Sequence, residues 1–128
     1  MKDLNIPSTK TTPTVLFDAT TGNLQLIGRS IPENPTEFYQ VIYHWLDDYA
    51  LNPASKTTLT VKVDYFMTSS SKCLLYIFKR LETISLFGHN VEIHWYHLEE
   101  DTDMHEAGED YETLLKIPFR IIAAEEMK

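Results

Sequence analysis

The chain contains little cysteine, little glycine, few basic residues and no long apolar run. Its one cysteine, Cys73, excludes an internal disulfide and a cysteine metal cluster. Its four glycines are scattered, so there is no glycine-rich loop to cradle a phosphate. No uncharged apolar run approaches the roughly 20 residues of a membrane-spanning helix, and the N-terminus has no apolar signal-peptide core. These absences favour a cytoplasmic protein that is not inserted in a membrane.

Basic charge is scarce relative to acidic charge. The chain has 11 Lys and Arg against 19 Asp and Glu, a formal net charge of -8. Nucleic-acid backbones and anionic membranes attract Lys and Arg, so neither is an expected partner. Much of the acid lies between residues 99 and 112. Such a run is usually a solvated face, and the alternative is that it docks a partner with a basic patch.

Length and composition indicate one folded domain. At 128 residues the chain has the usual size of a single domain. Hydrophobic residues make up 43% of it, which is enough for a packed core and too much for a disordered chain. We expect residues 1–12 to form an N-terminal arm ended by Pro13, and residues 13–128 to form the domain.

The spacing of apolar residues predicts five strands and three helices. Period-two alternation places the strands at residues 14–19, 24–28, 58–66, 91–97 and 117–122, with the first two forming a hairpin around Gly22. Asn34 is the expected cap of the first helix, and Pro35 suits its first position. The expected buried residues are Phe38, Val41, Ile42, Trp45, Leu46 and Tyr49 in the first helix, Leu74, Ile77, Phe78, Leu81 and Ile84 in the second, and Met104, Ala107, Tyr111, Leu114 and Leu115 in the third.

The resulting order is ββαβαβαβ, which predicts an α/β fold with a mixed sheet. Strands separated by helices usually lie parallel and are joined by right-handed crossovers, and the opening hairpin supplies an antiparallel edge. Strands buried on both faces tend to be apolar throughout, but these carry Lys62, Asp64, Glu92 and His94 on one side. We therefore expect helices mainly on one face of the sheet.

The histidines and hydroxyl residues form no recognisable metal or catalytic site. His94 and His97 are three apart on a strand, so they point to opposite faces and cannot pair on one ion. A calcium loop starting at Asp101 fails because Glu106 stands where the sharp turn needs Gly. No nucleophile elbow or Cys–His motif is present. We expect no metal, no cofactor and no catalytic activity.

The segment MTSSSK, residues 67–72, places four hydroxyl residues between a strand and a helix. Thr68 or Ser69 is expected to cap the helix by accepting a bond from a free backbone N–H. Capping does not explain four hydroxyls in a row. A phosphate here would sit at the positive end of the helix dipole, with Lys72 one turn on. By these arguments alone, any of the four hydroxyls is a candidate phosphorylation site.

Several motifs resemble known regulatory families. The element order, with a hydroxyl residue at the start of the helix after the central strand, resembles the STAS-type anti-sigma-factor antagonists, which are switched by phosphorylation at that place. The match is closer to the SiaC family of bacterial regulatory phosphoproteins, to which IPSTKTTPTV, GRSIPENP, YFMTSSSK and EAGEDYE are similar. This resemblance spans nearly the whole chain and implies a single STAS-like domain.

The resemblance also implies a function. SiaC-family proteins are not enzymes; unphosphorylated, they bind and activate a diguanylate cyclase, a GGDEF protein, which raises cyclic-di-GMP and favours biofilm. The implied partners are this cyclase, a dedicated Ser/Thr protein kinase and a PP2C-type phosphatase. By its position in the motif, the phosphoacceptor here is Thr68. Met67 stands where many family members carry Asn.

The loop before the first helix and the end of the central strand are expected to share one edge of the sheet and form one partner surface. This surface comprises Arg29, Ser30, Ile31, Pro32, Glu33, Asn34, Phe66, Met67, Ser69, Ser70 and Lys72. Two alternatives remain open. In the first alternative the chain is a scaffold that binds through its acidic helix. In the second it is an anti-sigma-antagonist-like partner-switching protein with a different output.

Overall fold

A computed structural model describes residues 1–127 as one sheet with three helices. The strands are β1 (Leu4–Ile6), β2 (Thr14–Phe17), β3 (Asn23–Ser30), β4 (Lys56–Phe66), β5 (Asn90–Leu98) and β6 (Phe119–Ala124). The helices are α1 (Pro35–Tyr49), α2 (Thr68–Leu86) and α3 (Thr102–Leu114). The predicted α/β class and the predicted order from Thr14 onward are confirmed, and one strand is added before them.

The added strand is β1, which lies within the segment predicted to be an N-terminal arm. It pairs antiparallel with β2 at the edge of the sheet. The indole of Trp45 also donates a hydrogen bond of 2.9 Å to the carbonyl oxygen of Lys2. Residues 4–6 are therefore part of the sheet rather than of an arm. A strand of three residues is too short for alternation to reveal it.

The six strands lie side by side in the order of the sequence. Strands β1 to β3 are antiparallel, and β3 to β6 are parallel. The predicted hairpin around Gly22 is confirmed. This glycine has a φ of 74°, and a Cβ there would lie 2.1 Å from the carbonyl oxygen of Lys56. The turn therefore requires glycine both for its backbone angle and for its close contact.

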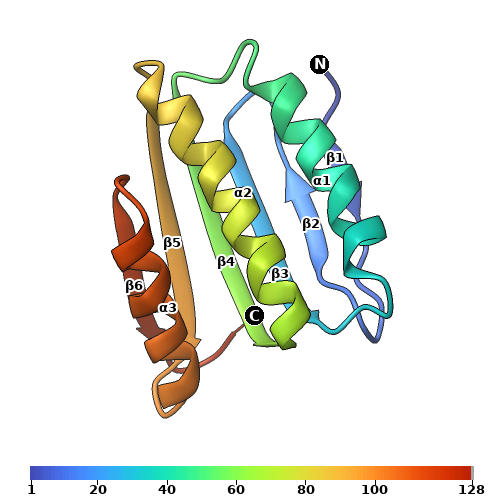
Figure 1. Cartoon of the computed structure of the whole chain (residues 1–128), viewed down its shortest axis with the longest axis vertical. Coiled ribbons are helices and arrows are strands. Elements are labelled where there is room, and N and C mark those ends of the chain that lie inside the picture. The colour runs from blue at the N-terminus through green and yellow to red at the C-terminus, as the bar shows by residue number, and fades with distance from the viewer. Residues whose placement is uncertain (128) are drawn as a thin grey trace.

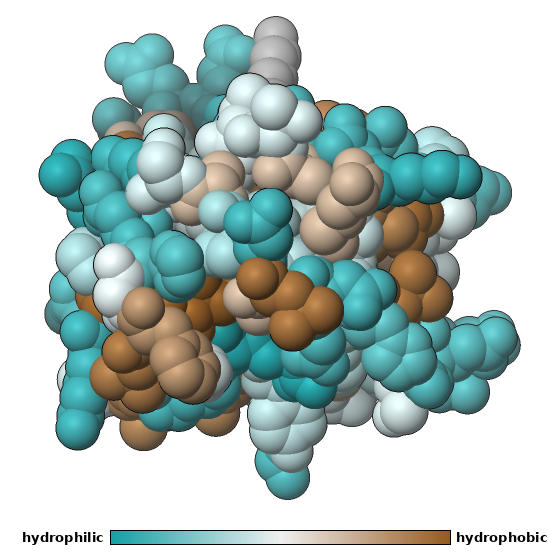
Figure 2. Space-filling view, turned by 90° about the horizontal axis from the view of Figure 1, so that it is seen from above, coloured by the Kyte–Doolittle hydropathy of each residue, from teal (hydrophilic) through white to brown (hydrophobic). Residues whose placement is uncertain are grey.

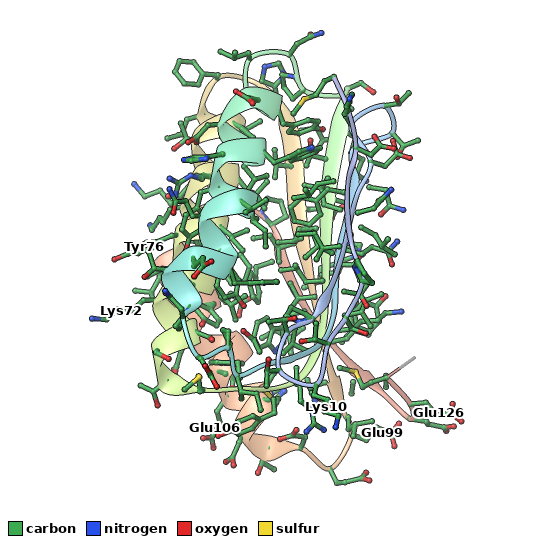
Figure 3. The ribbon with its side chains drawn as sticks, turned by 90° about the vertical axis from the view of Figure 1, so that its right-hand side faces the viewer. Lys10, Lys72, Tyr76, Glu99, Glu106 and Glu126 are labelled. Atoms are coloured by element: carbon green, nitrogen blue, oxygen red, sulfur yellow. The ribbon has the colours of Figure 1, made fainter. Side chains whose placement is uncertain are left out.

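All three helices cover the same face of the sheet, as predicted (Figure 1). In the side view the helices form one layer and the strands form another (Figure 3). The core lies between these layers. Its largest fully buried side chains are Trp95, Tyr39, Tyr49, Phe17, Phe78, Leu24, Leu26, Ile42, Leu46, Leu59, Leu74 and Ile77.

The predicted cap and most of the predicted buried positions are confirmed, but Phe38 and Ala107 are only partly buried and Val41 and Leu114 are exposed. The Asn34 side chain accepts a hydrogen bond from the Glu37 backbone N–H, as expected of an N-cap. Val41, which was predicted to be buried, is exposed. Tyr39, which was not predicted to be buried, lies in the core instead. Leu114, the last residue of α3, is also exposed, and the next residue, Leu115, is buried instead.

Gly108 of α3 packs directly against the ring of Trp95. A Cβ at this position would lie 2.7 Å from the indole Cδ1 atom. Gly to Ala usually stabilises an exposed helix by about 1 kcal/mol, but here the added methyl overpacks a buried ring. Gly108→Ala is therefore expected to lower the free energy of unfolding by about 1–3 kcal/mol, measured by urea titration. A stabilised variant would show that the two elements are not in contact.

The face without helices carries one cluster of charges around Glu92. Its carboxylate lies 2.7 Å from the ammonium of Lys56 and 3.6 Å from the guanidinium of Arg120. The ring of His94 lies 3.4 Å away. The hydrogen bond from Lys56, followed by the nearby ring of His94, holds the pKa of Glu92 below its ordinary value of 4.5.

This cluster makes stability depend on pH. Because folding lowers the pKa of Glu92, its contribution is fully present above pH 4.5 and is lost as the pH falls through the lower pKa of the folded chain. We expect the Glu92→Gln variant to lose less stability than the wild type between pH 5 and 3, each measured by urea titration. Parallel pH profiles for the two proteins would contradict the assignment.

Candidate functional site

The carboxyl ends of β3 and β4 bring two predicted segments together. Arg29 pairs with Tyr65 and Ser30 with Phe66 in the parallel register. The backbone N–H of Met67 then donates to the carbonyl oxygen of Ser30 over 3.0 Å. Residues 29–34 and 66–72 thus share one edge, as expected, and we call these two segments the acceptor edge.

Two serines of the acceptor edge are buried and hydrogen-bonded to each other. Ser30 and Ser70 are both fully buried, and their hydroxyls lie 3.0 Å apart. The hydroxyl of Tyr39 lies 2.5 Å from that of Ser30, and burial raises the pKa of Tyr39 to about 12. Pro32 is buried as well. These side chains hold α1, α2 and β3 together and cannot touch a partner, although they belong to the predicted partner surface.

The remaining predicted surface residues reach solvent to different degrees. Ile31, Phe66 and Met67 are partly buried. The exposed members are Arg29, Glu33, Asn34, Ser69 and Lys72, together with Thr68. The guanidinium of Arg29 lies 3.8 Å from the carboxylate of Asp64, and both side chains are about half exposed. The accessible part of the acceptor edge is therefore polar and carries both signs of charge.

Thr68 is the first residue of α2, and its side chain is exposed. The N-cap is Met67, which makes no side-chain capping bond. The prediction that Thr68 or Ser69 caps this helix is therefore wrong. A capping residue stands just before the first helical residue, and Thr68 is itself the first helical residue. Its hydroxyl is therefore not placed to accept from the free N–H groups of the first turn as a cap would. Among residues 1–127 the Thr68 hydroxyl has no hydrogen-bond partner.

The start of α2 is suited to hold added negative charge. The first N–H groups of a helix lack intrahelical acceptors and lie at the positive end of its dipole. Lys72 stands four residues after Thr68, on the same side of the helix. A phosphate on Thr68 would therefore meet backbone donors and one cation without burying its charge.

The other side chains considered as metal ligands or nucleophiles, the histidines and Cys73, do not come together in one site. His94 and His97 lie on opposite faces of β5, as predicted, and His97 instead contacts His105, with 3.1 Å between ring nitrogens. Within the described part of the chain, no three His, Cys, Asp or Glu side chains gather as metal ligands. Cys73 is buried, and its thiol faces the Ser69 carbonyl oxygen at 3.6 Å. Over residues 1–127 no helix is long and apolar enough to cross a membrane.

Sequence reasoning missed two tyrosines that fix the acceptor edge. Tyr39 reaches it from α1 through Ser30. Tyr111 reaches it from α3, where its hydroxyl donates to the carbonyl oxygen of Ser71 over 2.8 Å. Tyr111 was predicted to be buried in the core, but nothing in the spacing indicated that its hydroxyl would join α3 to the first turn of α2.

A single α/β domain with helices on one face, and with an exposed hydroxyl where a helix begins at the carboxyl edge of the sheet, is the arrangement of STAS-like regulatory domains. A family model described as SiaC family regulatory phosphoprotein matches residues 6–124. The chain therefore belongs to the SiaC family, as the motifs predicted.

Relatives from Pseudomonas aeruginosa support this assignment. An uncharacterised protein of strain UCBPP-PA14 is 29% identical over 126 residues, covering 98% of this chain and 100% of the relative. The crystal structure of apo-SiaC has a TM-score of 0.88 at 29% identity, covering 96% of this chain and 100% of SiaC. SiaC in complex with the diguanylate cyclase SiaD, of which it is the activator, has a TM-score of 0.90 at 29% identity, covering 95% and 100% of the chains.

Proposed function

We propose that the chain is a non-enzymatic regulator that binds and activates a diguanylate cyclase when Thr68 is unphosphorylated. A Ser/Thr protein kinase adds the phosphate and a PP2C-type phosphatase removes it. Membership of a regulatory phosphoprotein family supports the switch. The complex of the similar SiaC with SiaD supports the cyclase as partner. This role belongs in the cytoplasm, where the nucleotide substrates of the cyclase and the kinase are found.

The observation that carries the proposal is the environment of Thr68. Its hydroxyl is exposed and lies on the acceptor edge, where a kinase and a cyclase both have access. Two of the three neighbouring hydroxyls are less suitable acceptors, and Ser69 is exposed like Thr68. Ser70 is buried, and the hydroxyl of Ser71 donates to the Thr68 carbonyl oxygen over 2.6 Å.

The same environment argues against nucleophilic catalysis. A reactive hydroxyl needs a general base within hydrogen-bond reach, and across the described residues no side chain lies at that distance from Thr68. The thiol of Cys73 is buried and faces a backbone carbonyl. These groups fit a protein whose hydroxyl is modified by another enzyme.

A second candidate function rests on α3. The exposed face of this helix carries Asp103, Glu106, Glu109, Asp110 and Glu112. A scaffold that binds a basic partner through these side chains would lose affinity steeply with salt, and Thr68 would have no effect on it. Binding to the cyclase at several salt concentrations separates the two functions.

The experiment that tests the proposal is intact-mass analysis of the chain isolated from its native cells, followed by mapping of the modified peptide. A phosphate on Thr68 is expected. A phosphate confined to Ser69 or Ser71, or none under any growth condition, would contradict the proposal.

A further inference from the structure

The outer edge of β6 is an unpaired side of the sheet. β6 ends the strand order, and within residues 1–127 it pairs only with β5. The strand at the opposite edge, β1, has three residues, whereas β6 has six. Very short edge strands resist pairing with other chains, and longer ones present a row of backbone groups to them. Of the two edges of the sheet, β6 is therefore the one open to an added strand.

The hydrogen bonds between β5 and β6 show which backbone groups of β6 face outward. The carbonyl oxygens of Pro118 and Ala124 accept from N–H groups of β5 over 3.0 Å. Alternate residues of a parallel strand bond to the same neighbour, so Ile122 also bonds to β5. Ile121 and Ala123 therefore direct their N–H and C=O groups away from the sheet. Such alternating outward groups are what an added strand binds.

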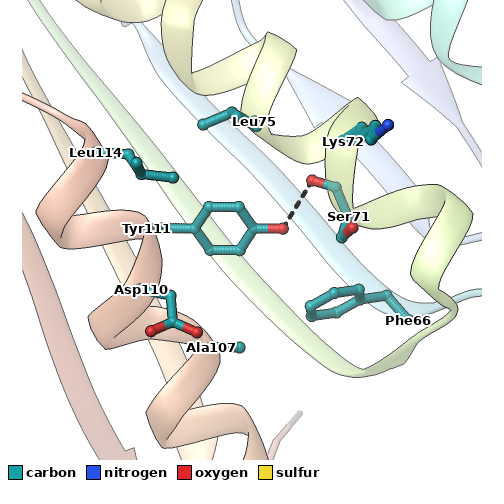
Figure 4. Close-up of a pocket in the computed structure, with 8 residues that line it drawn as sticks. All are labelled: Phe66, Ser71, Lys72, Leu75, Ala107, Asp110, Tyr111 and Leu114. Carbon is teal, nitrogen blue, oxygen red and sulfur yellow. Dashed lines mark hydrogen bonds between the residues drawn. The ribbon is translucent and has the colours of Figure 1, made fainter.

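One side of α3 runs along this edge. α3 packs on β5 and β6, and β6 forms the edge of the sheet beyond it (Figure 1). Asp110 and Leu114 stand on the side of α3 that lines a groove with α2 (Figure 4). His105, Glu109 and Glu112 recur at steps of four and three residues, so they share the other side. The side of α3 nearest the free edge is therefore acidic.

A contact between two histidines places this acidic side at the level of the outward backbone groups. The Nδ1 atom of His105 lies 3.1 Å from the Nε2 atom of His97 in β5. His97 is in turn the register partner of Ala123. The carboxylate of Glu109 lies 3.4 Å from the ring of His105, and its side chain is 56% exposed. Negative charge thus lies beside the part of the edge where Ala123 presents its N–H.

This charge determines which kind of chain can pair with β6. Two copies of the chain joined antiparallel at β6 would bring both α3 helices to the same side of the joined sheet, with Glu109 and Glu112 of each copy facing those of the other. Like charges oppose such pairing, and charged side chains commonly protect sheet edges in this way. A segment with Lys or Arg at alternate positions has the opposite effect. Alternate side chains of a strand point to one face, so its cations can face α3 while the residues between them lie beside the partly buried Ile122.

We propose that β6 is a docking edge for an extended basic segment of another protein, which adds a strand to the sheet beside α3. Backbone hydrogen bonds to Ile121 and Ala123 supply the affinity, and Glu109 and Glu112 select for Lys and Arg. This site is separate from the acceptor edge and does not involve Thr68, so its failure would leave the proposed function standing. It also differs from binding through the exposed acidic face of α3, because the backbone of β6 makes the contact.

The probe is a short peptide in which Lys and Val alternate, and its match is a peptide in which Glu and Val alternate. Amide hydrogen exchange of the full chain, followed by NMR, reports the contact residue by residue. With the Lys–Val peptide at about ten times its Kd, exchange at Ile121 and Ala123 is expected to slow about 10-fold. Exchange at Ile122, which already bonds to β5, is expected to stay the same. The Glu–Val peptide is expected to change none of the three, and no slowing by the Lys–Val peptide at Ile121 and Ala123 would overturn the proposal.

Variants of the chain separate backbone pairing from attraction between charges. Ala123→Pro removes an outward N–H and keeps the bonds to β5, because proline is tolerated on an edge strand where its N–H would face solvent. It is expected to weaken binding of the Lys–Val peptide at least about 10-fold. The double variant Glu109→Gln, Glu112→Gln is expected to weaken binding about 3- to 10-fold at low salt and to make it less sensitive to salt. Unchanged affinity in Ala123→Pro would show that no strand is added at β6.

A control variant tests whether the peptide merely adheres to exposed apolar side chains. Leu51, Leu86 and Phe87 are exposed at the end of the molecule shown in Figure 2, away from the outward groups of β6. Leu86→Ser is expected to leave peptide binding unchanged, and loss of binding in this variant would contradict docking at β6. A wild-type dimer that Ala123→Pro abolishes would assign the edge to a second copy of the chain and overturn the choice of a basic partner.

Discussion

A chain that carries phosphothreonine at position 68 is expected to lose its affinity for the cyclase while remaining folded. The phosphate adds about -1.5 to -2 charges at neutral pH. Covering such a group without a matched cation on the partner costs about 2–5 kcal/mol, which is a 30- to 5,000-fold loss of affinity. Titration calorimetry against SiaD measures the loss, and thermal unfolding shows whether the fold is kept.

The control for this experiment is Thr68→Ala. Because Met67 is the N-cap and the Thr68 hydroxyl bonds to no described residue, removing the hydroxyl is expected to change the free energy of unfolding by less than about 0.5 kcal/mol. Thr68→Ala should bind the cyclase as the wild type does. Thr68→Asp should fall between the two, since a carboxylate carries less charge than a phosphate. Loss of binding in Thr68→Ala would show that the hydroxyl itself, not the phosphate, governs docking.

The largest expected loss of stability comes from Phe78→Ala. Phe78 is fully buried, and its ring packs against Tyr111 at 5.0 Å, Phe119 at 5.9 Å and Trp95 at 6.4 Å between centroids. Emptying this position removes contacts from α2, α3, β5 and β6 at once. We expect the free energy of unfolding to fall by about 3–5 kcal/mol in urea titrations, a large part of the 5–15 kcal/mol typical of a domain.

Phe87→Ala is the matched control, because it makes the same substitution just after the end of α2. Phe87 is 80% exposed, so its removal is expected to change the free energy of unfolding by less than about 0.5 kcal/mol. Similar losses in the two variants would contradict the assignment of Phe78 to the centre of the core.

Periodicity was sufficient to predict the parallel sheet and the covered face. Along most of β4, for example, buried Val61 and Val63 alternate with more exposed Lys62 and Asp64. The first helix was predicted one position out of phase at Val41, because aromatic and β-branched residues both stand near the edge of its stripe. The spacing of apolar residues does not show which residue at the edge of the stripe is buried. The contact of Tyr39 with Ser30, which comes from the tertiary structure, places Tyr39 in the core.

The acceptor edge shows where sequence reasoning ends. The parallel order of β3 and β4 puts their carboxyl ends at one edge of the sheet, so the meeting of the two segments was predictable. The burial of Ser30 and Ser70 was not, because a serine pair forty residues apart carries no local signal. The cap was missed for a related reason. The Ser70 N–H donates to the Met67 carbonyl oxygen, so Met67 is the N-cap and Thr68 is already the first helical residue.

The groove between α2 and α3 was also beyond the sequence. Leu75, Ala107 and Tyr111 have the spacing of ordinary core residues. They line a groove of about 310 Å³ between α2 and α3 because of where α3 lies, and that position is set by the close packing of Gly108 on Trp95 and by the Tyr111 hydrogen bond to Ser71. Such a separation is set by packing between elements, not by the pattern within either one.

The strand order allows the sheet to form from the N-terminal strands toward the C-terminal ones. Because each strand pairs with its neighbours in the sequence, every new strand joins the free edge of the sheet already made. On a ribosome that adds 5–20 residues per second, the roughly 60 residues after Phe66 emerge over about 3–12 s. The strands and the helix start that carry the acceptor edge, β3, β4 and the first turn of α2, are thus synthesised before α3. The edge is completed last, when Tyr111 of α3 bonds to the carbonyl oxygen of Ser71.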